Sequence, residues 1–310
     1  MPYYPPQKEQ EPRERAPRGR IWVRRGLVCA CALAAAYGAV RLAGYGLELA
    51  SARRTTQEMR EIAETAETEA PVLKAAAAET DEPAAQAGEL IRAAETARDP
   101  EAENGEKEER LPAVEYPNGY DLVPRIQKLR KKSRYVIGWL TMDDLDEPVV
   151  QKDNTFFLNH DAGGHRNSNG AIFMDESTGL LTRPYTIFLY GHNMKSGAMF
   201  GNLRKYEEYA YCYRHRKFRF DTLYEEGEYV IFAVQTISLT PGKSRYVNLS
   251  GLDSSDRRTR REALEALQDT SRHDLLTDVN EEDQVLLLLT CVGDDDERLV
   301  VAARRTREGE

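Results

Sequence analysis

Short apolar runs separated by turn-forming residues dominate the chain from about residue 113 onward. These runs are rich in β-branched and aromatic side chains, and their length is typical of strands. The predicted strands are 135–141, 148–151, 171–174, 186–190, 217–220, 228–239, 284–291 and 299–303. Eight short strands at this spacing predict a mainly β domain, either a barrel or a sandwich.

Two helices are expected among these strands. Residues 125–132 combine basic side chains with apolar ones at helical spacing, as expected for a basic amphipathic helix. Residues 256–268 begin with an aspartate and carry Leu264 and Leu267 at helical spacing. The second helix is therefore predicted as an insertion that precedes the last two strands.

The last two predicted strands form a hairpin that holds reactive side chains. An apolar run, 285–289, ends in Thr290-Cys291-Val292, an acidic loop follows, and Arg298 opens the next run. Across such a turn the Cys291 and Arg298 side chains can meet, and a thiol beside a fixed guanidinium is favoured as the thiolate. This pattern predicts a cysteine nucleophile at Cys291.

A histidine stands just beyond another predicted strand. Residues 186–190 are followed by Gly191-His192-Asn193-Met194 and a glycine-rich stretch, which indicates a position on the rim of the domain. Histidine is the usual proton-transfer partner of a cysteine nucleophile. The other four histidines have no comparable context, so His192 is the predicted partner of Cys291.

The N-terminal part of the chain has a different pattern. Residues 1–25 hold seven basic residues against three glutamates, and residues 26–40 are all apolar, small or aromatic. Extended to residue 50 with Arg41 snorkelling, this segment is long enough for a transmembrane signal-anchor. The charge bias then predicts a cytoplasmic tail at 1–25 and an extracellular C-terminal domain in the cell membrane. A cleaved signal peptide is the alternative, although Ala30-Cys31-Ala32 lies inside the apolar run.

Residues 51–112 are rich in alanine and glutamate, contain few large apolar side chains and are interrupted by Pro71, Pro83 and Pro100. This composition does not favour a packed core. It predicts a partly helical or disordered, solvated linker that holds the domain at 113–310 away from the membrane.

The cysteines are not arranged as a metal site. Cys29 and Cys31 lie in the apolar segment, and neither Cys212 nor Cys291 has the Cys-x-x-Cys or His/Cys spacing of a zinc site. A disulfide between Cys212 and Cys291 and a nucleophilic role for Cys212 are weaker alternatives. The run 294–296 could resemble a calcium loop, but acids on a turn are usually solvated. We therefore expect no metal and no cofactor.

Several segments, taken in order, resemble the class B sortases, the membrane-anchored cysteine transpeptidases of Gram-positive bacteria. The resemblance covers roughly residues 115–306. It is carried by Val136-Ile137-Gly138-Trp139-Leu140, Pro148-Val149-Val150-Gln151, Phe157-Leu158-Asn159-His160-Asp161, Gly170-Ala171-Ile172-Phe173-Met174-Asp175, the Tyr-Gly-His-Asn-Met segment at 190–194, Thr290-Cys291 and Arg298-Leu299-Val300-Val301. The long helix before the cysteine strand favours class B over class A.

This resemblance implies a sortase-type eight-stranded β-barrel with peripheral helices, with Cys291, His192 and Arg298 as the catalytic residues. Thr290 and Tyr246 are the candidates for substrate binding, with ordinary packing as the alternative for Tyr246. The implied substrates are secreted proteins with a C-terminal signal of the Leu-Pro-x-Thr-Gly or Asn-Pro-x-Thr-x type. They would pass through a Cys291 thioester to an amine of a cell-wall precursor or a pilin, with no nucleic acid involved.

The chain also departs from the family pattern. Leu289 replaces a hydroxyl residue near the expected peptide site, and Val292 stands where an acid is common. Two other functions are considered: an inactive, membrane-tethered sortase-like binding module, and a Cys/His transpeptidase acting on peptidoglycan stem peptides. The intact trio disfavours the first. The wide sequence separation of His192 and Cys291 disfavours the second.

Overall fold

A computed structural model describes residues 18–77, 122–292 and 296–310. Its strands are β1 (Val136–Met142), β2 (Leu145–Val150), β3 (Ile172–Met174), β4 (Thr186–Tyr190), β5 (Lys217–Thr222), β6 (Glu228–Ser238), β7 (Val285–Cys291) and β8 (Glu297–Arg305). The helices are α1 (Arg18–Ala77), α3 (Pro124–Lys132), α4 (Tyr209–Arg214) and α5 (Arg257–Asp269). Short 3-10 turns are η1 (Phe156–Leu158), η2 (Gly201–Glu207) and η3 (Leu249–Asp253). Residues 1–47 and 48–310 form separate compact units, and the strands belong to the second.

The eight strands close into a barrel in the order β1-β2-β3-β4-β7-β8-β6-β5. This confirms the eight predicted strands and decides for a barrel over a sandwich. The pairings of β2 with β3 and of β4 with β7 are parallel, whereas the other neighbours are antiparallel. A parallel pair needs a long connection, which for β4 and β7 includes β5, β6 and α5.

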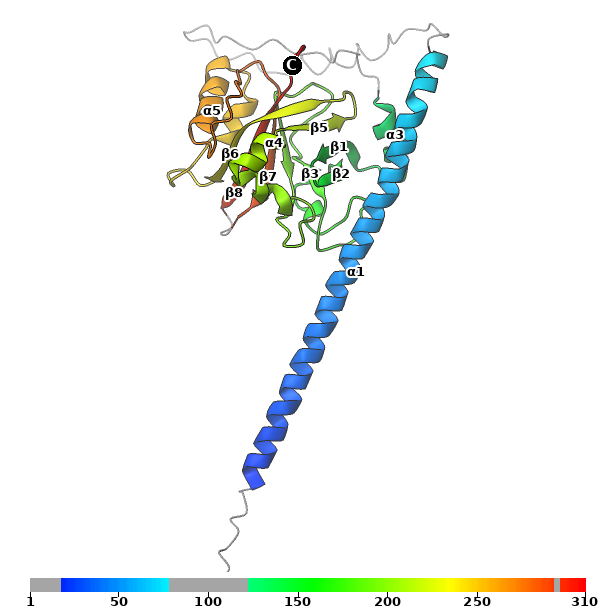
Figure 1. The fold of residues 1–310 in the computed structure, drawn as a ribbon, viewed down its shortest axis with the longest axis vertical. Coiled ribbons are helices and arrows are strands. Elements are labelled where there is room, and N and C mark those ends of the chain that lie inside the picture. Colours follow the sequence, from blue (N-terminus) through cyan, green and yellow to red (C-terminus); the bar gives the residue numbers. More distant parts are fainter. Residues whose placement is uncertain (1–17, 78–121, 293–295) are drawn as a thin grey trace, which may run out of the picture. The chain divides into compact units, whose positions relative to one another are not determined.

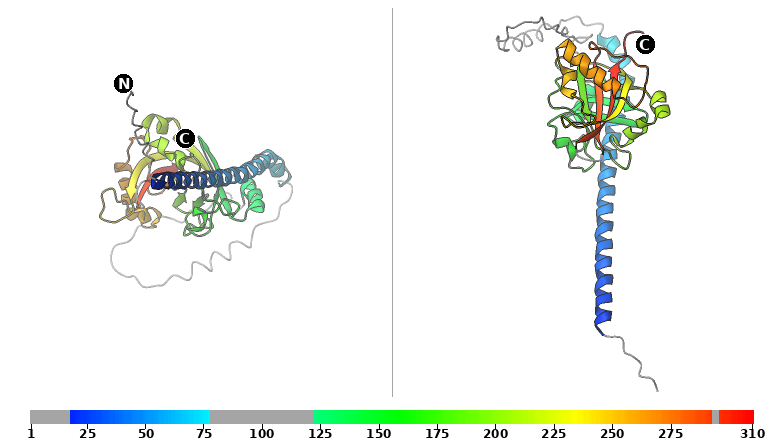
Figure 2. Two further views of the ribbon diagram at one scale, coloured as in Figure 1. Left: turned by 90° about the horizontal axis from the view of Figure 1, so that it is seen from below. Right: turned by 90° about the vertical axis from the view of Figure 1, so that its left-hand side faces the viewer.

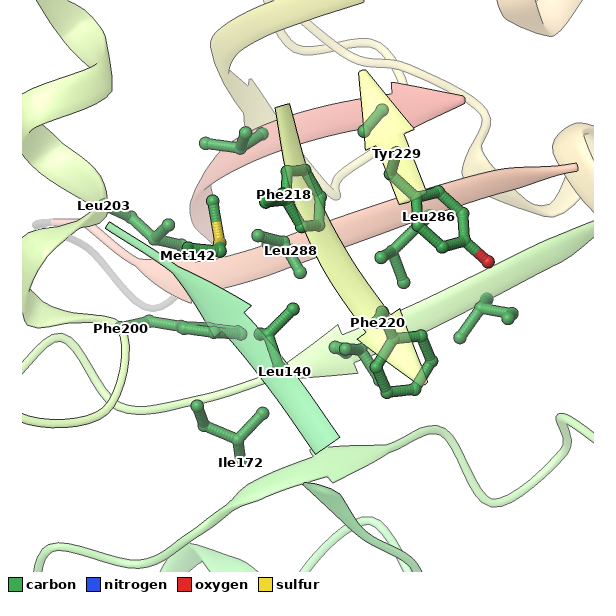
Figure 3. Close-up of a cluster of buried hydrophobic side chains, with 14 of the residues drawn as sticks. Leu140, Met142, Ile172, Phe200, Leu203, Phe218, Phe220, Tyr229, Leu286 and Leu288 are labelled. Atoms are coloured by element: carbon green, nitrogen blue, oxygen red, sulfur yellow. The ribbon is translucent and has the colours of Figure 1, made fainter. Parts of the chain in front are cut away.

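The strand β7 is apolar throughout because both of its faces are buried. Leu286 and Leu288 point into the barrel, where Figure 3 shows them among aromatic and aliphatic side chains such as Leu140 and Phe220. The alternate residues, including Leu287 and Leu289, pack outward with α5. Full burial of a leucine side chain contributes about 1.5–3 kcal/mol. The uninterrupted leucine run thus serves two hydrophobic clusters at once.

Helix α5 covers one side of the barrel, as Figures 1 and 2 show. Its Asp256 N-cap accepts a hydrogen bond from the Thr259 backbone at 2.8 Å. The fully buried Arg260 donates to the Glu281 carbonyl at 2.7 Å and to the Thr186 hydroxyl at 3.0 Å. Since Thr186 begins β4 and Glu281 shortly precedes β7, this one guanidinium ties the helix to the starts of both parallel strands.

Another side of the barrel is covered by α3 and by the part of α1 that begins at Glu48 (Figure 1). Met59 and Ala63 of α1 are fully buried, in a cluster with Ile126 and Trp139. Among the α1 residues whose side chains the structure describes, the buried positions are Ala52, Thr56, Met59, Ala63 and Ala66, a stripe at spacings of three and four. The first part of the expected 51–112 linker therefore differs from a solvated tether, because small side chains suffice for close helix packing. Residues 78–112 lie outside the described part of the chain.

Within the residues that the structure describes, no helix combines the length and apolar character needed to cross a membrane.

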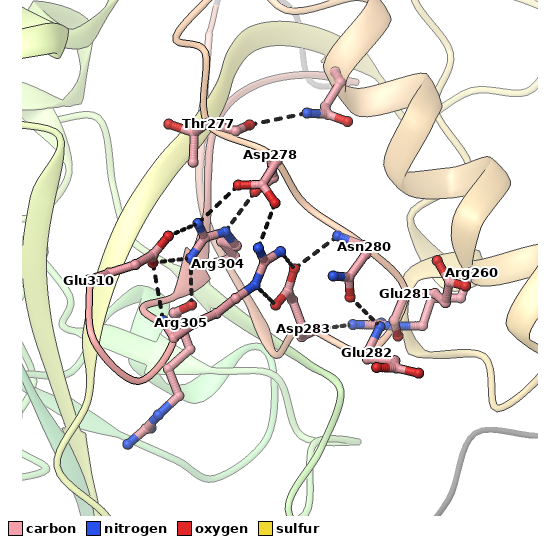
Figure 4. Close-up of polar contacts among 12 residues, drawn as sticks. Arg260, Thr277, Asp278, Asn280, Glu281, Glu282, Asp283, Arg304, Arg305 and Glu310 are labelled. Atoms are coloured by element: carbon pink, nitrogen blue, oxygen red, sulfur yellow. Dashed lines mark hydrogen bonds and ion pairs between the residues drawn. The ribbon is translucent and has the colours of Figure 1, made fainter.

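The C-terminal end is held by a network of ion pairs shown in Figure 4. Arg304, only 2 % exposed, donates to the Asp278 carbonyl at 2.6 Å and pairs with the Glu310 carboxylate at 2.7 Å. On the neighbouring segment, the hydrogen bond from Arg261 is the main cause that lowers the pKa of Glu281 to about 2. These carboxylates stabilise the folded chain only while they are ionised.

The pH dependence of stability is predicted to reflect Glu281. Its pKa is about 2 when folded and has an ordinary value near 4.5, so its contribution is present above about pH 4.5 and is lost as the pH falls toward 2. We expect Glu281→Gln to lower the urea midpoint of unfolding at pH 6. At pH 3 the difference in urea midpoint between this variant and the parent should be smaller. Glu262→Gln, in an exposed helix pair, is the control. An equal gap at both pH values would contradict this role.

Candidate active site

The ends of β4 and β7 lie next to each other at one end of the barrel. The two strands run parallel, with Tyr190 opposite Leu289 in the register. The Gly191 N–H donates to the Leu289 carbonyl at 3.3 Å, and the Thr290 hydroxyl donates to the Gly191 carbonyl at 2.8 Å. Parallel strands end at the same edge of a sheet. His192 and Cys291, each two positions past this register pair, therefore lie at the same end of the barrel.

A hydrogen bond links the two segments at the level of the cysteine itself. The Asn193 side-chain amide donates to the Cys291 carbonyl at 2.9 Å. This contact fixes the histidine-bearing segment to the end of β7. The sequence did not single out Asn193, and its place directly after His192 is the only signal that could have done so.

Cys291 and Arg298 face each other across the β7–β8 hairpin. They are register partners, and the Cys291 side chain is exposed. This confirms the predicted hairpin and its pairing. β8 lies between β7 and β6, so Arg298 is not an edge-strand charge that discourages aggregation. Its guanidinium also donates to the Glu297 carbonyl at 3.0 Å, which limits the directions it can take.

The His192 ring is held from two sides. Its Nε2 lies 2.7 Å from the Leu158 carbonyl oxygen, which can only accept a hydrogen bond. Nε2 therefore carries a proton, and Nδ1 is the nitrogen left for proton transfer. Gly170 lies so close that a Cβ there would be 3.1 Å from the His192 Cδ2. Neither Leu158 nor Gly170 was predicted as a neighbour of the histidine, since both contacts are non-local.

Tyr190, the last residue of β4, interacts with Asp175, which directly follows β3. The Tyr190 hydroxyl donates to the Asp175 carboxylate at 3.1 Å. Burial raises the pKa of Tyr190, and the nearby Arg298 charge opposes that shift. Arg298 thus lies near the end of β4 as well as opposite Cys291 in the hairpin.

The structure places the two predicted substrate-binding residues differently. Thr290 is 2 % exposed, and its hydroxyl is used by the Gly191 carbonyl, so its side chain joins the two strand ends. Tyr246 is 40 % exposed and forms an isolated bridge with Ser238. Ser238 follows Ile237, the β6 register partner of Arg298. Tyr246 stays a candidate for substrate contact at this end of the barrel.

Cys212 has the environment of a core residue. It is fully buried in α4, and burial raises the pKa of its thiol to about 12. Cys212 and Cys291 are both free thiols, so the disulfide considered from the sequence does not join them here. No group of three or more His, Cys, Asp or Glu residues within the described ranges could hold a metal ion. Asp294 and Asp295 lie outside those ranges.

Residues 140–306 match the model of the Sortase domain family. Over 113 residues the chain is 37 % identical to sortase B of Listeria monocytogenes, and over 171 residues it is 27 % identical to sortase B of Staphylococcus aureus. These matches cover 35 % and 53 % of this chain. The Listeria match spans 46 % of that relative's length, and the S. aureus match spans 66 %.

A solved structure shares the fold over a longer stretch. The crystal structure of sortase B from B. anthracis in complex with AAEK1 superposes with a TM-score of 0.54 at 30 % identity. The similarity covers 64 % of this chain and 90 % of that one. The similarity thus extends over nearly all of the B. anthracis chain.

Proposed function

Because this chain belongs to the sortase family, in its class B, we propose that it is a cysteine transpeptidase that joins proteins bearing a C-terminal sorting signal to an amine acceptor. One observation carries the proposal: parallel β4 and β7 end side by side, which brings His192 to Cys291, while β8 sets Arg298 opposite the thiol. A nucleophile, a proton carrier and a fixed cation at one rim are the groups that acyl transfer needs.

In the first half-reaction the Cys291 thiolate attacks the carbonyl carbon of the threonine in the signal. The bond to the following residue breaks, and His192 gives a proton from Nδ1 to the departing amine. The product is a thioester between Cys291 and the threonine. Throughout this step Nε2 keeps its proton, because the Nε2–H group continues to donate a hydrogen bond to the Leu158 carbonyl.

In the second half-reaction the acceptor amine attacks the thioester carbon. Nδ1 of His192 takes the proton that the amine loses, the carbon–sulfur bond breaks, and Cys291 leaves as the thiolate. The net result is a new amide and an enzyme returned to its starting charge state. The acceptor belongs to a cell-wall precursor or to a pilin in this proposal.

Arg298 stabilises the oxygen that becomes negatively charged in both steps. Its backbone is paired on both sides in β8 and its guanidinium donates to the Glu297 carbonyl at 3.0 Å, which limits the reorganisation needed when the charge develops. A planar guanidinium can present two donors to one peptide, which a lysine ammonium cannot do with fixed geometry.

The signal is of the Leu-Pro-x-Thr-Gly or Asn-Pro-x-Thr-x type, as the resemblance implies. Leu289 does not change this expectation, because its side chain is only 2 % exposed and packs in the cluster beneath α5. An inactive binding module would not need Cys291, His192 and Arg298 together, and the paired strand ends therefore favour catalysis.

The anchor at residues 26–50, with the tail at 1–25 in the cytoplasm and the barrel outside, stays a proposal from the sequence, since no helix among the described residues has the length and apolar character of a membrane span. The apolar run and the seven basic residues before it support this placement. Protease treatment of intact cells is expected to release the barrel. A mature N-terminus near residue 33 or 50 would indicate cleavage as a signal peptide instead.

The function is tested by trapping the thioester. Incubation with a sorting-signal peptide, followed by mass spectrometry, is expected to show an acyl adduct on Cys291 that an added amine discharges. Cys291→Ala should abolish the adduct, whereas Cys212→Ala, at a buried thiol, should retain most of it. A folded Cys212 variant as inactive as the Cys291 variant would overturn the assignment.

Replacement of Arg298 by lysine separates two roles for its charge. If Arg298 stabilises the oxyanion through placed donors, Arg298→Lys should lose at least about tenfold in the rate of peptide cleavage, since loss of one such donor typically costs about a hundredfold or more. The urea midpoint should stay near the parent value. A cleavage rate within a few-fold of the parent, with unchanged Cys291 alkylation, would rule out the oxyanion role.

A further inference from the structure

Helix α1 makes polar contacts with the loop 161–168, which precedes the Gly170 turn beside the His192 ring. The Asn167 side-chain amide donates to the Glu48 carbonyl at 2.7 Å and to the Ser51 hydroxyl at 3.1 Å. Beside it, the Ser168 N–H donates to the Glu48 carboxylate at 3.1 Å, and the Thr55 hydroxyl donates to Asp161 at 3.3 Å. All of these residues belong to the same compact unit. The stretch of α1 from Glu48 to Thr55 therefore binds the 161–168 loop through several hydrogen bonds.

Asn167 also organises the turn that follows it. Its side-chain oxygen accepts from the Asn169 N–H at 3.0 Å and from the Asn169 amide at 2.8 Å. Its own carbonyl accepts from the Gly170 N–H at 3.1 Å. The nitrogen of the Asn167 amide must face α1, because the Glu48 carbonyl can only accept, and this settles the orientation of the amide. Asn167 is 1 % exposed and Asn169 is fully buried.

The turn ends at Gly170, against the histidine ring. Gly170 has a φ of +65°, and a Cβ there would lie 2.4 Å from the Phe157 carbonyl oxygen. The Ala171 N–H donates to the same carbonyl at 3.0 Å. Since the next carbonyl, that of Leu158, faces Nε2 of His192, the segment at 157–158 and Gly170 together hold the ring.

We infer that α1 positions the catalytic histidine, and that Asn167 is the positioning residue that links the helix to the His192 ring. This inference rests on the proposed function, in which His192 transfers the proton. Asn167 does not touch the reacting atoms. It joins Glu48 and Ser51 on one side to the Asn169–Gly170 turn on the other, so a shift of α1 moves the surface on which the imidazole rests.

Loss of the Asn167 contact between α1 and the Gly170 turn is expected to change kcat more than the binding of the peptide. A misplacement of about 1 Å in a catalytic group can cost about a hundredfold in rate. A partial loosening of the ring is therefore expected to lower kcat by about tenfold, while KM for the peptide changes by less than about twofold. A contact that only stabilised the fold would move the unfolding temperature and leave kcat of the folded enzyme unchanged.

The decisive variant is Asn167→Asp in the full chain. Aspartate keeps an oxygen for the Asn169 donors but loses the N–H that binds the Glu48 carbonyl, which can only accept, so it breaks that hydrogen bond on the helix side of the link. Gln57→Ala, at an exposed position of α1 outside this contact, is the matched control. Ser51→Ala is the second variant, and it serves if Asn167→Asp does not fold.

The readouts are kcat and KM for a sorting-signal peptide, the unfolding temperature, and the side-chain nitrogen shifts of 15N-histidine protein, which report the His192 tautomer. We expect Asn167→Asp to lower kcat by about tenfold and to shift the His192 signals, with Gln57→Ala unchanged in both. A folded variant with kcat within twofold and unmoved His192 signals overturns the inference, even if its unfolding temperature falls.

Failure of the proposed function is recognised separately. If the parent cleaves no sorting-signal peptide and forms no Cys291 thioester, the proposed reaction fails. The His192 signals still decide the structural link. Signals that move in Asn167→Asp support it, and signals that do not move overturn it.

Discussion

The parallel pairing of β4 with β7 is the constraint on which the site depends. Had these strands been antiparallel, the segment after Tyr190 and the end of β7 would leave from opposite ends of the barrel, and no loop could bring His192 to Cys291. The parallel pairing requires the long excursion through β5, β6 and α5. Arg260, which binds the starts of both strands, holds the pair in register from the far end.

Closure of the barrel also fixes the β7–β8 hairpin that carries Cys291 and Arg298. With β8 between β7 and β6, Arg298 stands in a fully paired strand, and its position relative to Cys291 is set by backbone hydrogen bonds on both sides. Exposed ion pairs are weak and mobile. A cation carried on a strand that is paired on both sides starts from a fixed backbone position next to an exposed thiol.

The sequence predicted what depends on local patterns. The eight strands, the helices at 125–132 and 256–268, the β7–β8 hairpin and the rim position of His192 all follow from periodicity and turn residues. The β4–β7 pairing and the Leu158 and Gly170 contacts join distant segments and leave no periodic signal. The packing of α1 against the barrel was not predicted from the sequence. Its buried stripe consists mostly of alanines, and an alanine-rich and glutamate-rich composition predicts a solvated segment. The substrate-binding role of Thr290 stays a prediction, and the hydrogen bond from its buried hydroxyl to the Gly191 carbonyl is a further non-local contact that the sequence did not indicate.

The apolar character of β7 has a consequence for how the chain reaches its folded state. A run of valine and leucines without charge or proline is the kind of segment that pairs with copies of itself into cross-β aggregates. Charged gatekeepers cannot be placed within it, because both faces are buried in the finished barrel. Its partner β4 lies about a hundred residues earlier, so the contact that protects β7 forms only after a large loop closes. The strand that ends in the nucleophile is thus also the segment most exposed to misassembly until the barrel is complete.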